Sequence, residues 1–301
     1  MRIEIIGVPP VEVTGISNSH AGGLAFATEA YLEAGLLEEI AAAGVEVTGV
    51  VRPGLPAAER GSDPVMNLGL YNAHVAAAVA SAIERRVKPV LAGGTCNHLV
   101  GMLAGLQQAY GPTSRIGLIW FDAHGDFNTP RTSYTQMLGG MPVAVCAGLC
   151  HPAWRELAGL EVPLSTDRIL FVDVRNLDDR EETLIRATDA RIVKFGESGG
   201  IDEIVAAVED LADRVDHLYL HIDADVLDGS LQPNHPTVEP NGPDLATVQT
   251  AIARIFETGL VRAYAVVSVN PTGPDGHISL ASGKSLLTGA IAAWAAQPED
   301  Q

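Results

Sequence analysis

Apolar and polar positions along the chain follow two different periods. Short runs rich in Val, Ile and Leu are typical of strands, and they alternate with longer segments in which apolar residues recur at helical spacing. The pattern predicts strands at Ile3–Gly7, Val45–Val51, Pro89–Ala92, Ile116–Phe121, Ile169–Val174, Arg191–Val193, Leu218–Ile222 and Ala263–Val269. It predicts helices near Leu24–Ala43, Gly69–Glu84, Asn97–Tyr110, Asp178–Ala187, Ile201–Val215, Asp244–Thr258 and Ser282–Ala296.

The regular alternation of strands and helices predicts an α/β fold of three layers, α/β/α, with a mainly parallel sheet of roughly eight strands. No linker, change of composition or internal repeat divides the chain, so we expect a single domain over residues 1–301. Ligands of such sheets bind beyond the carboxyl ends of the strands. Long polar loops at 128–137, 229–243 and 270–278 are therefore expected to surround a site.

Two of the predicted strands end in side chains that can bind metal. These side chains are Asp122, His124 and Asp126 after the fourth strand, and Asp223, Asp225 and Asp228 after the seventh. Alternate residues of extended chain face the same side, so Asp122, His124 and Asp126 can converge on one point, and Asp223 and Asp225 repeat this spacing, with Asp228 following them. Either motif alone would also suit an ordinary turn, in which Asp and Gly act as caps. Both together gather carboxylates that repel one another, and a divalent cation, or a pair of them, is the simplest way to neutralise them.

The net charge and the composition argue against some classes of binding partner and some cellular locations. The formal net charge is −18, which opposes binding to nucleic acid or to an anionic membrane surface. The amino terminus lacks the apolar run of a signal peptide, and no segment is apolar for long enough to cross a bilayer. Three cysteines, Cys96, Cys146 and Cys150, give no disulfide framework and fit a reducing compartment. We therefore expect a cytoplasmic protein that acts on a small molecule.

Three motifs in order resemble the metal-binding motifs of the ureohydrolase family, which includes the arginases and agmatinases. They are Gly93-Gly94-Thr95-Cys96-Asn97, Asp122-Ala123-His124-Gly125-Asp126 and Asp223-Ala224-Asp225-Val226-Leu227-Asp228. Weaker similarity at 33–36, 174–181 and 269–271 extends the resemblance over nearly the whole chain. The resemblance implies an arginase-like fold, metal-dependent hydrolysis of a non-peptide C–N bond in a linear amidine or guanidine, and a homo-oligomer, either a trimer or a hexamer.

The resemblance also implies a binuclear metal centre. One metal would be held by Cys96, Asp122, Asp126 and Asp223, and the other by Asp122, His124, Asp223 and Asp225. Manganese is the expected metal, and zinc, iron or cobalt would also suit these ligands. Two such cations lower the pKa of a bridging water, and the resulting hydroxide would attack the substrate. Asp126 would orient this hydroxide and carry its proton to the leaving nitrogen.

Cys96 stands where the usual family pattern has a histidine. As a thiolate it adds a negative charge to the predicted centre, which would then carry about −2 overall instead of about −1. It also favours softer metal ions. Two alternatives remain open: Cys96 is a small buried apolar residue beside a Gly-Gly turn, or His98 is the ligand in its place.

Two further departures concern the reaction itself. Gly139-Gly140 replaces a family histidine that is thought to transfer protons, and Ser268 replaces a glutamate that binds the guanidinium of the substrate. His235 is the predicted substitute for proton transfer, and His20 also lies in a loop that could reach the site, although loop histidines are commonly solvated. The loss of the glutamate weakens guanidinium recognition. It favours a hydroxyguanidino, ureido or simple amide group.

The mouth of the predicted site suggests an amino-acid-like substrate. By resemblance, Asn128 and Thr135 would bind an α-carboxylate, while Asp178 and Glu181 would lie near an α-amino group. Asp178 and Glu181 would equally suit the acidic first turn of a helix. Thr237 and Ser268 complete the predicted substrate-binding set.

The sequence therefore predicts a binuclear-metal hydrolase that cleaves a C–N bond of a small, amino-acid-derived substrate. A deacetylase-like amidohydrolase with one metal is an alternative, because the two folds are related, but Cys96, Asp126 and Asp225 would then be idle. A metal-retaining binding or regulatory protein without catalysis is the second alternative.

Overall fold

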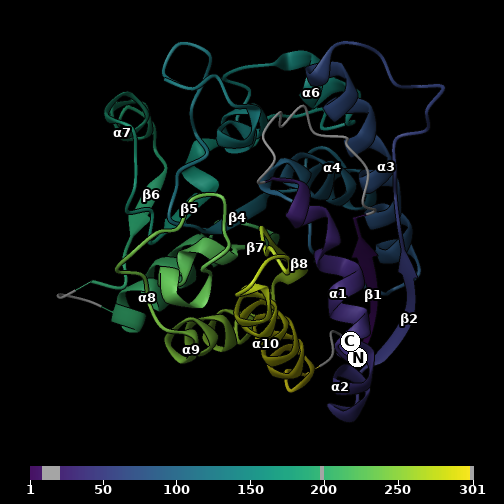
Figure 1. Ribbon diagram of the computed structural model, residues 1–301. Coiled ribbons are helices and arrows are strands. Elements are labelled where there is room, and N and C mark those ends of the chain that lie inside the picture. Colours follow the sequence, from purple (N-terminus) through teal and green to yellow (C-terminus); the bar gives the residue numbers. More distant parts are fainter. Residues whose placement is uncertain (9–20, 197–199, 299–301) are drawn as a thin grey trace.

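The computed structural model describes residues 1–8, 21–196 and 200–298. Over these residues the chain forms one eight-stranded sheet in which all neighbouring strands are parallel, with the order β2-β1-β3-β8-β7-β4-β5-β6 (Figure 1). The strands are β1 (Arg2–Gly7), β2 (Glu46–Val51), β3 (Lys88–Ala92), β4 (Ile116–Phe121), β5 (Ile169–Val172), β6 (Arg191–Val193), β7 (His217–Asp223) and β8 (Val261–Val267). The predicted α/β fold with a parallel sheet of eight strands is confirmed.

Helices cover both faces of the sheet (Figure 1). They are α1 (Ala27–Glu33), α2 (Leu36–Ala42), α3 (Pro64–Glu84), α4 (Leu99–Tyr110), α5 (Pro142–Cys146), α6 (Pro152–Leu157), α7 (Asp179–Arg186), α8 (Gly200–Ala212), α9 (Leu245–Phe256) and α10 (Gly276–Ala295). Short 3-10 turns are η1 (Ala21–Phe26), η2 (Cys96–His98), η3 (Leu138–Gly140), η4 (Thr166–Arg168), η5 (Ala224–Val226) and η6 (Gly229–Leu231). Among the described residues, none of the helices combines the length and the apolar character needed to cross a membrane.

Alternate residues of each strand point to opposite faces of the sheet, and each face packs against its own set of helices. The sheet between two layers of helices gives the three layers. In β4, Ile119 and Phe121 pack with α1, α2, α8, α9 and α10 on one face, whereas Leu118 and Trp120 pack with α3, α4, α5 and α6 on the other. Because the strands are buried on both faces, their sequences are almost continuously apolar rather than alternating. Phe121 and Trp120 are fully buried. The sheet is therefore a rigid support for whatever follows its strands.

The prediction of one continuous helix at Leu24–Ala43 is wrong, because this segment contains two helices, α1 and α2. Gly35 adopts φ +80°, a conformation that ends α1 and starts α2 in a new direction. The short helices α5 and α6 were not predicted, since each is only one to two turns long and begins with a proline, Pro142 or Pro152. α10 begins at Gly276, six residues before the predicted start at Ser282.

Strand register brings the polar motifs to one edge. Phe121 of β4 lies opposite Ile222 of β7, and Asp223 lies opposite Val267 of β8. Asp122, Asp223 and Ser268 therefore emerge side by side from three adjacent strands. β3 is the next strand beyond β8 and leads through Gly93 and Gly94 into η2, which carries Cys96.

Candidate metal centre

Each acidic motif is held in a tight turn by its own backbone. The amide of His124 donates to Asp122 Oδ1 at 2.6 Å, and the amide of Asp225 donates to Asp223 Oδ1 at 3.0 Å. The two turns are joined because the amide of Ala123 donates to Asp225 Oδ1 at 3.1 Å. These bonds fix the orientation of three carboxylates before any ligand arrives.

Arg175 locks the same turns from the loop after β5. Its guanidinium is paired with Asp173 at 2.9 Å and donates to the carbonyls of Asp225 and Val226, both at 3.0 Å. The backbone amide of Arg175 donates to the carbonyl of Ala123 at 2.9 Å. A planar guanidinium with five donors can hold several carbonyls at once, so the geometry of the acidic edge is preorganised.

The structure brings potential metal-binding side chains together in three groups. They are Cys96 with Asp122 and Asp223, Asp122 with His124 and Asp225, and Asp223 with Asp225 and His235, and in each group the ligand atoms lie within 4.8 Å of one another. Each pair of groups shares one aspartate. The shared aspartates are what a centre for more than one cation requires, because a carboxylate has two oxygens that can bind different ions.

Cys96 faces the centre from η2. Its Sγ lies 2.8 Å from Asp223 Oδ2 and 3.8 Å from Asp122 Oδ2, and the side chain is almost fully buried. Ser268 donates from its hydroxyl to the same Asp223 Oδ2. Cys96 therefore lies where the predicted first metal would bind.

His124 has one ring nitrogen fixed and the other directed at carboxylates. Its Nε2 lies 3.1 Å from Glu239 Oε1, and a carboxylate can only accept, so Nε2 carries the proton. Its Nδ1 lies 3.3 Å from Asp122 Oδ1 and 3.0 Å from Asp225 Oδ2, so it carries a proton when no metal is bound and can give its lone pair to a cation in place of that proton. A lone pair facing two carboxylates is stabilised only by a cation or a further proton, and the carboxylate–histidine arrangement is typical of metal ligands.

Burial and mutual repulsion dominate the electrostatics of the centre. Burial, followed by the charges of Asp225 and Asp223, raises the pKa of Asp122 well above its ordinary value. Burial and Asp225 raise the pKa of Asp223 to about 6. Burial would also raise the pKa of Asp225, but the neighbouring His235 and His124 lower it below its usual range. Burial and the nearby aspartates raise the pKa of the Cys96 thiol.

These donors fit divalent metal ions. Asp225 Oδ2 and His235 Nε2 are buried and lack a hydrogen-bond partner among the described residues. Buried polar atoms of native proteins normally have partners, and a divalent cation between these two atoms would satisfy both. Carboxylate, imidazole and thiolate are ligands of first-row divalent metals.

Asp126 belongs to none of the three groups. Its backbone has φ +45°, an unusual value for a residue with a side chain, and its carbonyl accepts from the amide of Val143 at 3.0 Å. Its carboxylate is buried, and its charge acts on Cys96. The structure therefore leaves Asp126 outside the three groups, and its roles as ligand and proton carrier remain predictions.

Two of the residues predicted to bind substrate, Asn128 and Asp178, are hydrogen-bonded to each other. Asn128 Nδ2 donates to Asp178 Oδ2 at 3.1 Å, so these two are in contact. Glu181 is buried and accepts from the amide of Phe127 at 2.8 Å, and burial raises its pKa to about 7. Thr135 and Thr237 are exposed in their loops.

Two further described histidines, His98 and His221, belong to none of the three groups. His98 is buried, with Nε2 3.2 Å from the Tyr71 hydroxyl and Nδ1 against Thr95, and it is in none of the three groups. His221 is packed in the core, stacked on Trp120 with ring centroids 4.1 Å apart. His20 lies outside the described residues.

Glu239, whose carboxylate holds His124, was not predicted from the sequence. Glu239 lies more than a hundred residues away, in the loop between η6 and α9, and no local motif marks it. Arg175 was inside a segment of weak family similarity, but its role as a clamp depends on loops that only the fold brings together.

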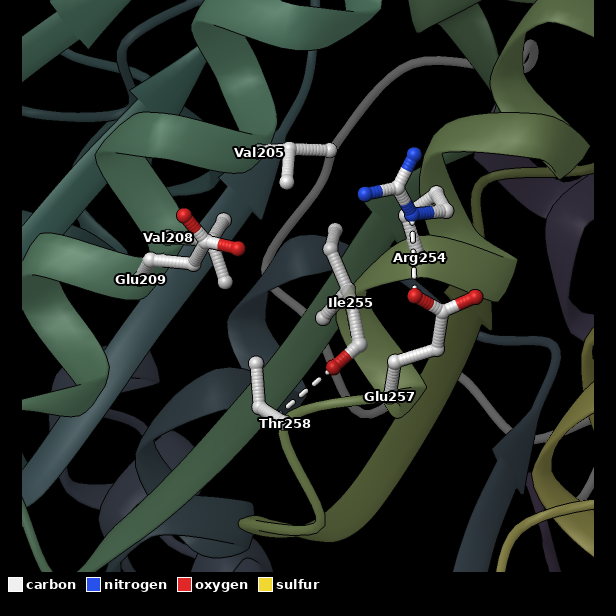
Figure 2. A pocket seen from close by; sticks show the side chains of 7 residues that line it. All are labelled: Val205, Val208, Glu209, Arg254, Ile255, Glu257 and Thr258. Atoms are coloured by element: carbon white, nitrogen blue, oxygen red, sulfur yellow. Dashed lines mark hydrogen bonds and ion pairs between the residues drawn. The ribbon is translucent and has the colours of Figure 1, made fainter.

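A pocket of about 230 Å³ lies between α8 and α9 (Figure 2). None of the candidate metal ligands lines it. It is lined by Val205, Val208, Glu209, Arg254, Ile255, Glu257 and Thr258. Thr258 comes just before β8, so this pocket lies at the amino-terminal edge of the sheet, opposite the edge that carries the aspartates. Its charged Arg254 is already paired with Glu257 at 2.9 Å. It is not the candidate active site.

Comparison with known proteins agrees with this geometry. The model of the arginase family matches residues 1–291. The arginase of Bacillus caldovelox is 31% identical over 222 residues, which cover 71% of this chain and 72% of that protein. Among solved structures, arginase from Bacillus subtilis superposes with a TM-score of 0.85 at 23% identity, covering 97% of this chain and 98% of that chain. Formimidoylglutamase from the same organism has a TM-score of 0.77 at 18% identity, covering 99% and 88%. The chain belongs to the arginase family.

Proposed function

We propose that this protein is a binuclear-metal hydrolase that cleaves a C–N bond of a small, amino-acid-derived molecule. One observation carries the proposal: three groups of metal-binding side chains share Asp122, Asp223 and Asp225 at the carboxyl ends of neighbouring strands. This edge is where sheets of this type bind their ligands. Manganese is the proposed metal, and cytoplasmic location and a homo-oligomeric state are part of the same proposal.

The cations, when bound, would supply a water whose pKa is lowered toward neutrality. The chain's own residues then have two tasks. The first is to bind the cations, which is proposed for Asp122, His124, Asp223 and Asp225. The hydrogen bonds of their turns and of Arg175 keep these side chains in position. Asp126 is the proposed group for moving a proton to the leaving nitrogen, since Gly139 offers no side chain for that step.

The proposed electrophile is a hydroxyguanidino, ureido or amidino group rather than an ordinary guanidinium. Ser268 occupies the position of the guanidinium-binding glutamate, and its hydroxyl is engaged by Asp223. A neutral hydroxyl cannot replace a bidentate carboxylate as a partner for a guanidinium. Asn128 with Asp178 would bind the amino-acid end of the substrate.

A turnover screen tests the proposal directly. The metal-loaded protein would be offered guanidino, hydroxyguanidino, ureido and amide derivatives of amino acids, with urea and ammonia release as the readouts. Asp225→Ala and Asp126→Ala should each lose metal and turnover together. Asp228→Asn is the matched control, because Asp228 lies in the same motif but binds Ser230 and Asn241 instead of the centre.

The outcomes separate the competing functions. Two ions per chain with turnover supports the hydrolase, and full turnover of either alanine variant would remove the mechanism. Two ions with no turnover on any class would instead favour a metal-retaining binding protein. A deacetylase-like centre would need only one ion, and Cys96 and Asp225 would be unnecessary, although both face the cluster in the structure.

A further inference from the structure

His235 lies against the acidic cluster rather than in solvent. Its side chain is only 7% exposed, with Nε2 3.6 Å from Asp223 Oδ1 and Nδ1 3.7 Å from Asp225 Oδ2. Nε2 is buried and has no hydrogen-bond partner among the described residues. A buried imidazole nitrogen without a hydrogen-bond partner costs free energy, and a cation shared with the facing carboxylate would remove that cost.

The contacts of Nδ1 are all with Thr237 and include both a donor and an acceptor. Nδ1 lies 2.7 Å from the carbonyl oxygen of Thr237, and 3.1 Å from both the amide nitrogen and the hydroxyl of the same residue. The amide of Thr237 can donate to Nδ1 when Nδ1 is unprotonated, and the carbonyl of Thr237 can accept from Nδ1 when Nδ1 carries the proton, so the loop can hold either tautomer. In the tautomer with the proton on Nδ1, the lone pair of Nε2 is free on the side of Asp223.

The loop that carries His235 is fixed from both sides. The carbonyl of Asn234 accepts from Asn270 Nδ2 at 2.9 Å, and Asn234 Nδ2 donates to the carbonyl of Thr272 at 2.6 Å. The amide of His235 donates to the carbonyl of Gln232 at 3.1 Å. The ring is therefore held in place by the loop after β8, and a fixed ring is what a ligand position requires.

We propose that His235 is a metal ligand through Nε2, binding the cation that Asp223 and Asp225 share. The centre would then have two imidazole ligands of matching design. In His124 the carboxylate of Glu239 can hold Nε2–H while Nδ1 faces the centre, and in His235 the carbonyl of Thr237 can hold Nδ1–H while Nε2 faces the centre. Hydrogen bonding of the remote nitrogen is the usual way to orient such a ligand.

His235 as a ligand would change the balance of ligand types in the centre without changing its charge. Cys96 replaces an imidazole of the family pattern by a thiolate, so the predicted centre gains negative charge. His235 adds a neutral ligand on the other side of Asp223 and restores a second imidazole without adding charge. A set of oxygen, nitrogen and sulfur ligands suits softer divalent ions, such as zinc or cobalt, better than an all-oxygen set does.

Cobalt(II) gives the sharpest test, because each bound imidazole keeps one N–H proton whose NMR signal is strongly shifted by the paramagnetic ion. The cobalt-loaded protein should show two such exchangeable signals, from His124 and His235, and His235→Gln should show one. By titration calorimetry with Co²⁺ and Mn²⁺, His235→Gln should weaken the affected site at least about tenfold. His74→Gln, at an exposed histidine paired with Glu59, is the control and should change neither readout.

A second variant guards against a simple loss of folding. His235→Cys should still bind two Co²⁺ ions and should increase the thiolate-to-cobalt charge-transfer absorption, which happens only if position 235 reaches the metal. If His235→Gln keeps the affinity and the number of shifted N–H signals of the wild type and alters only the pH profile of turnover, the inference is overturned in favour of proton transfer.

The inference rests on the proposed metal centre, and the two can fail separately. Failure of the wild-type chain to bind any metal overturns both. Two bound ions with a single shifted imidazole signal in the wild type overturn only the role of His235 and leave the hydrolase proposal standing.

Discussion

The hydroxyl of Ser268 donates a hydrogen bond of 2.5 Å to Asp223 Oδ2, the same oxygen that Cys96 contacts. The backbone of Ser268 has φ +63°, and its amide is held by the carbonyl of Gly94 at 2.9 Å. Left-handed backbone at a residue with a side chain costs free energy and persists where the surroundings enforce it. At this position the chain therefore orients a carboxylate of the centre.

Ser268→Ala should weaken metal binding without unfolding the protein. Asp223 Oδ2 would lose a donor that fixes its orientation, and loss of such a supporting bond typically costs about 10–100-fold in metal affinity. Titration calorimetry of the metal-free protein measures the change. Ser279→Ala is the control, because Ser279 is equally buried but its hydroxyl has no hydrogen-bond partner in the part of the chain described. Equal affinities in both variants would show that the bond is incidental.

Cys96→His should retain metal and change the preferred ion. Imidazole is a neutral and less soft ligand than the negatively charged thiolate. The relative affinity of the variant should therefore shift from softer ions toward Mn²⁺. Competition of Mn²⁺ against Zn²⁺ and Co²⁺, followed by metal analysis, checks this. Cys146→Ser is the matched control, because Cys146 is fully buried but lies outside the three ligand groups. A Cys96→Ala variant with wild-type affinity and preference would make the thiol a bystander.

The parts of this molecule that could be predicted from sequence are those set by short-range periodicity. The buried parallel strands were recognisable as apolar runs, and the polar motifs after them were expected at one edge of the sheet. That β4 and β7 are neighbours, which brings the two motifs together, is known only from the structure. The break at Gly35 was not predicted, since apolar spacing continues through it.

The supporting residues were harder to predict because they come from loops distant in sequence. Glu239 reaches His124, and Arg175 joins the turn after β4 to the turn after β7. The position of His235 depends on Asn270 and Thr272, which hold its neighbour Asn234. Such contacts arise from the folded arrangement and leave no periodic signal in the sequence.

Glu239→Ala should reduce metal affinity through His124. Without the carboxylate, the Nε2–H of His124 loses its acceptor, so the ring is no longer fixed with Nδ1 toward the centre, and a loss of about 10–100-fold in affinity is expected. Asn176→Ala provides a matched control. It removes the other hydrogen bond of Glu239, which is 2.9 Å long, and leaves the bond to His124 in place. A loss of equal size in both variants would mean that loop packing, rather than the histidine contact, controls affinity.

Glu181 makes the stability of the metal-free protein depend on pH. Burial raises its pKa from 4.5 to about 7, so between these values the folded state binds more protons than the unfolded state. The free energy of unfolding should therefore fall as the pH rises from about 4.5 to about 7, with Glu181 contributing at most about 3 kcal/mol. Glu181→Gln, whose amide oxygen can still accept from Phe127, should remove that part of the slope in urea unfolding of the metal-free protein. Glu182→Gln, at an exposed position of the same helix, should leave the slope intact, and an unchanged slope in Glu181→Gln would show that Glu181 is ionised throughout this range.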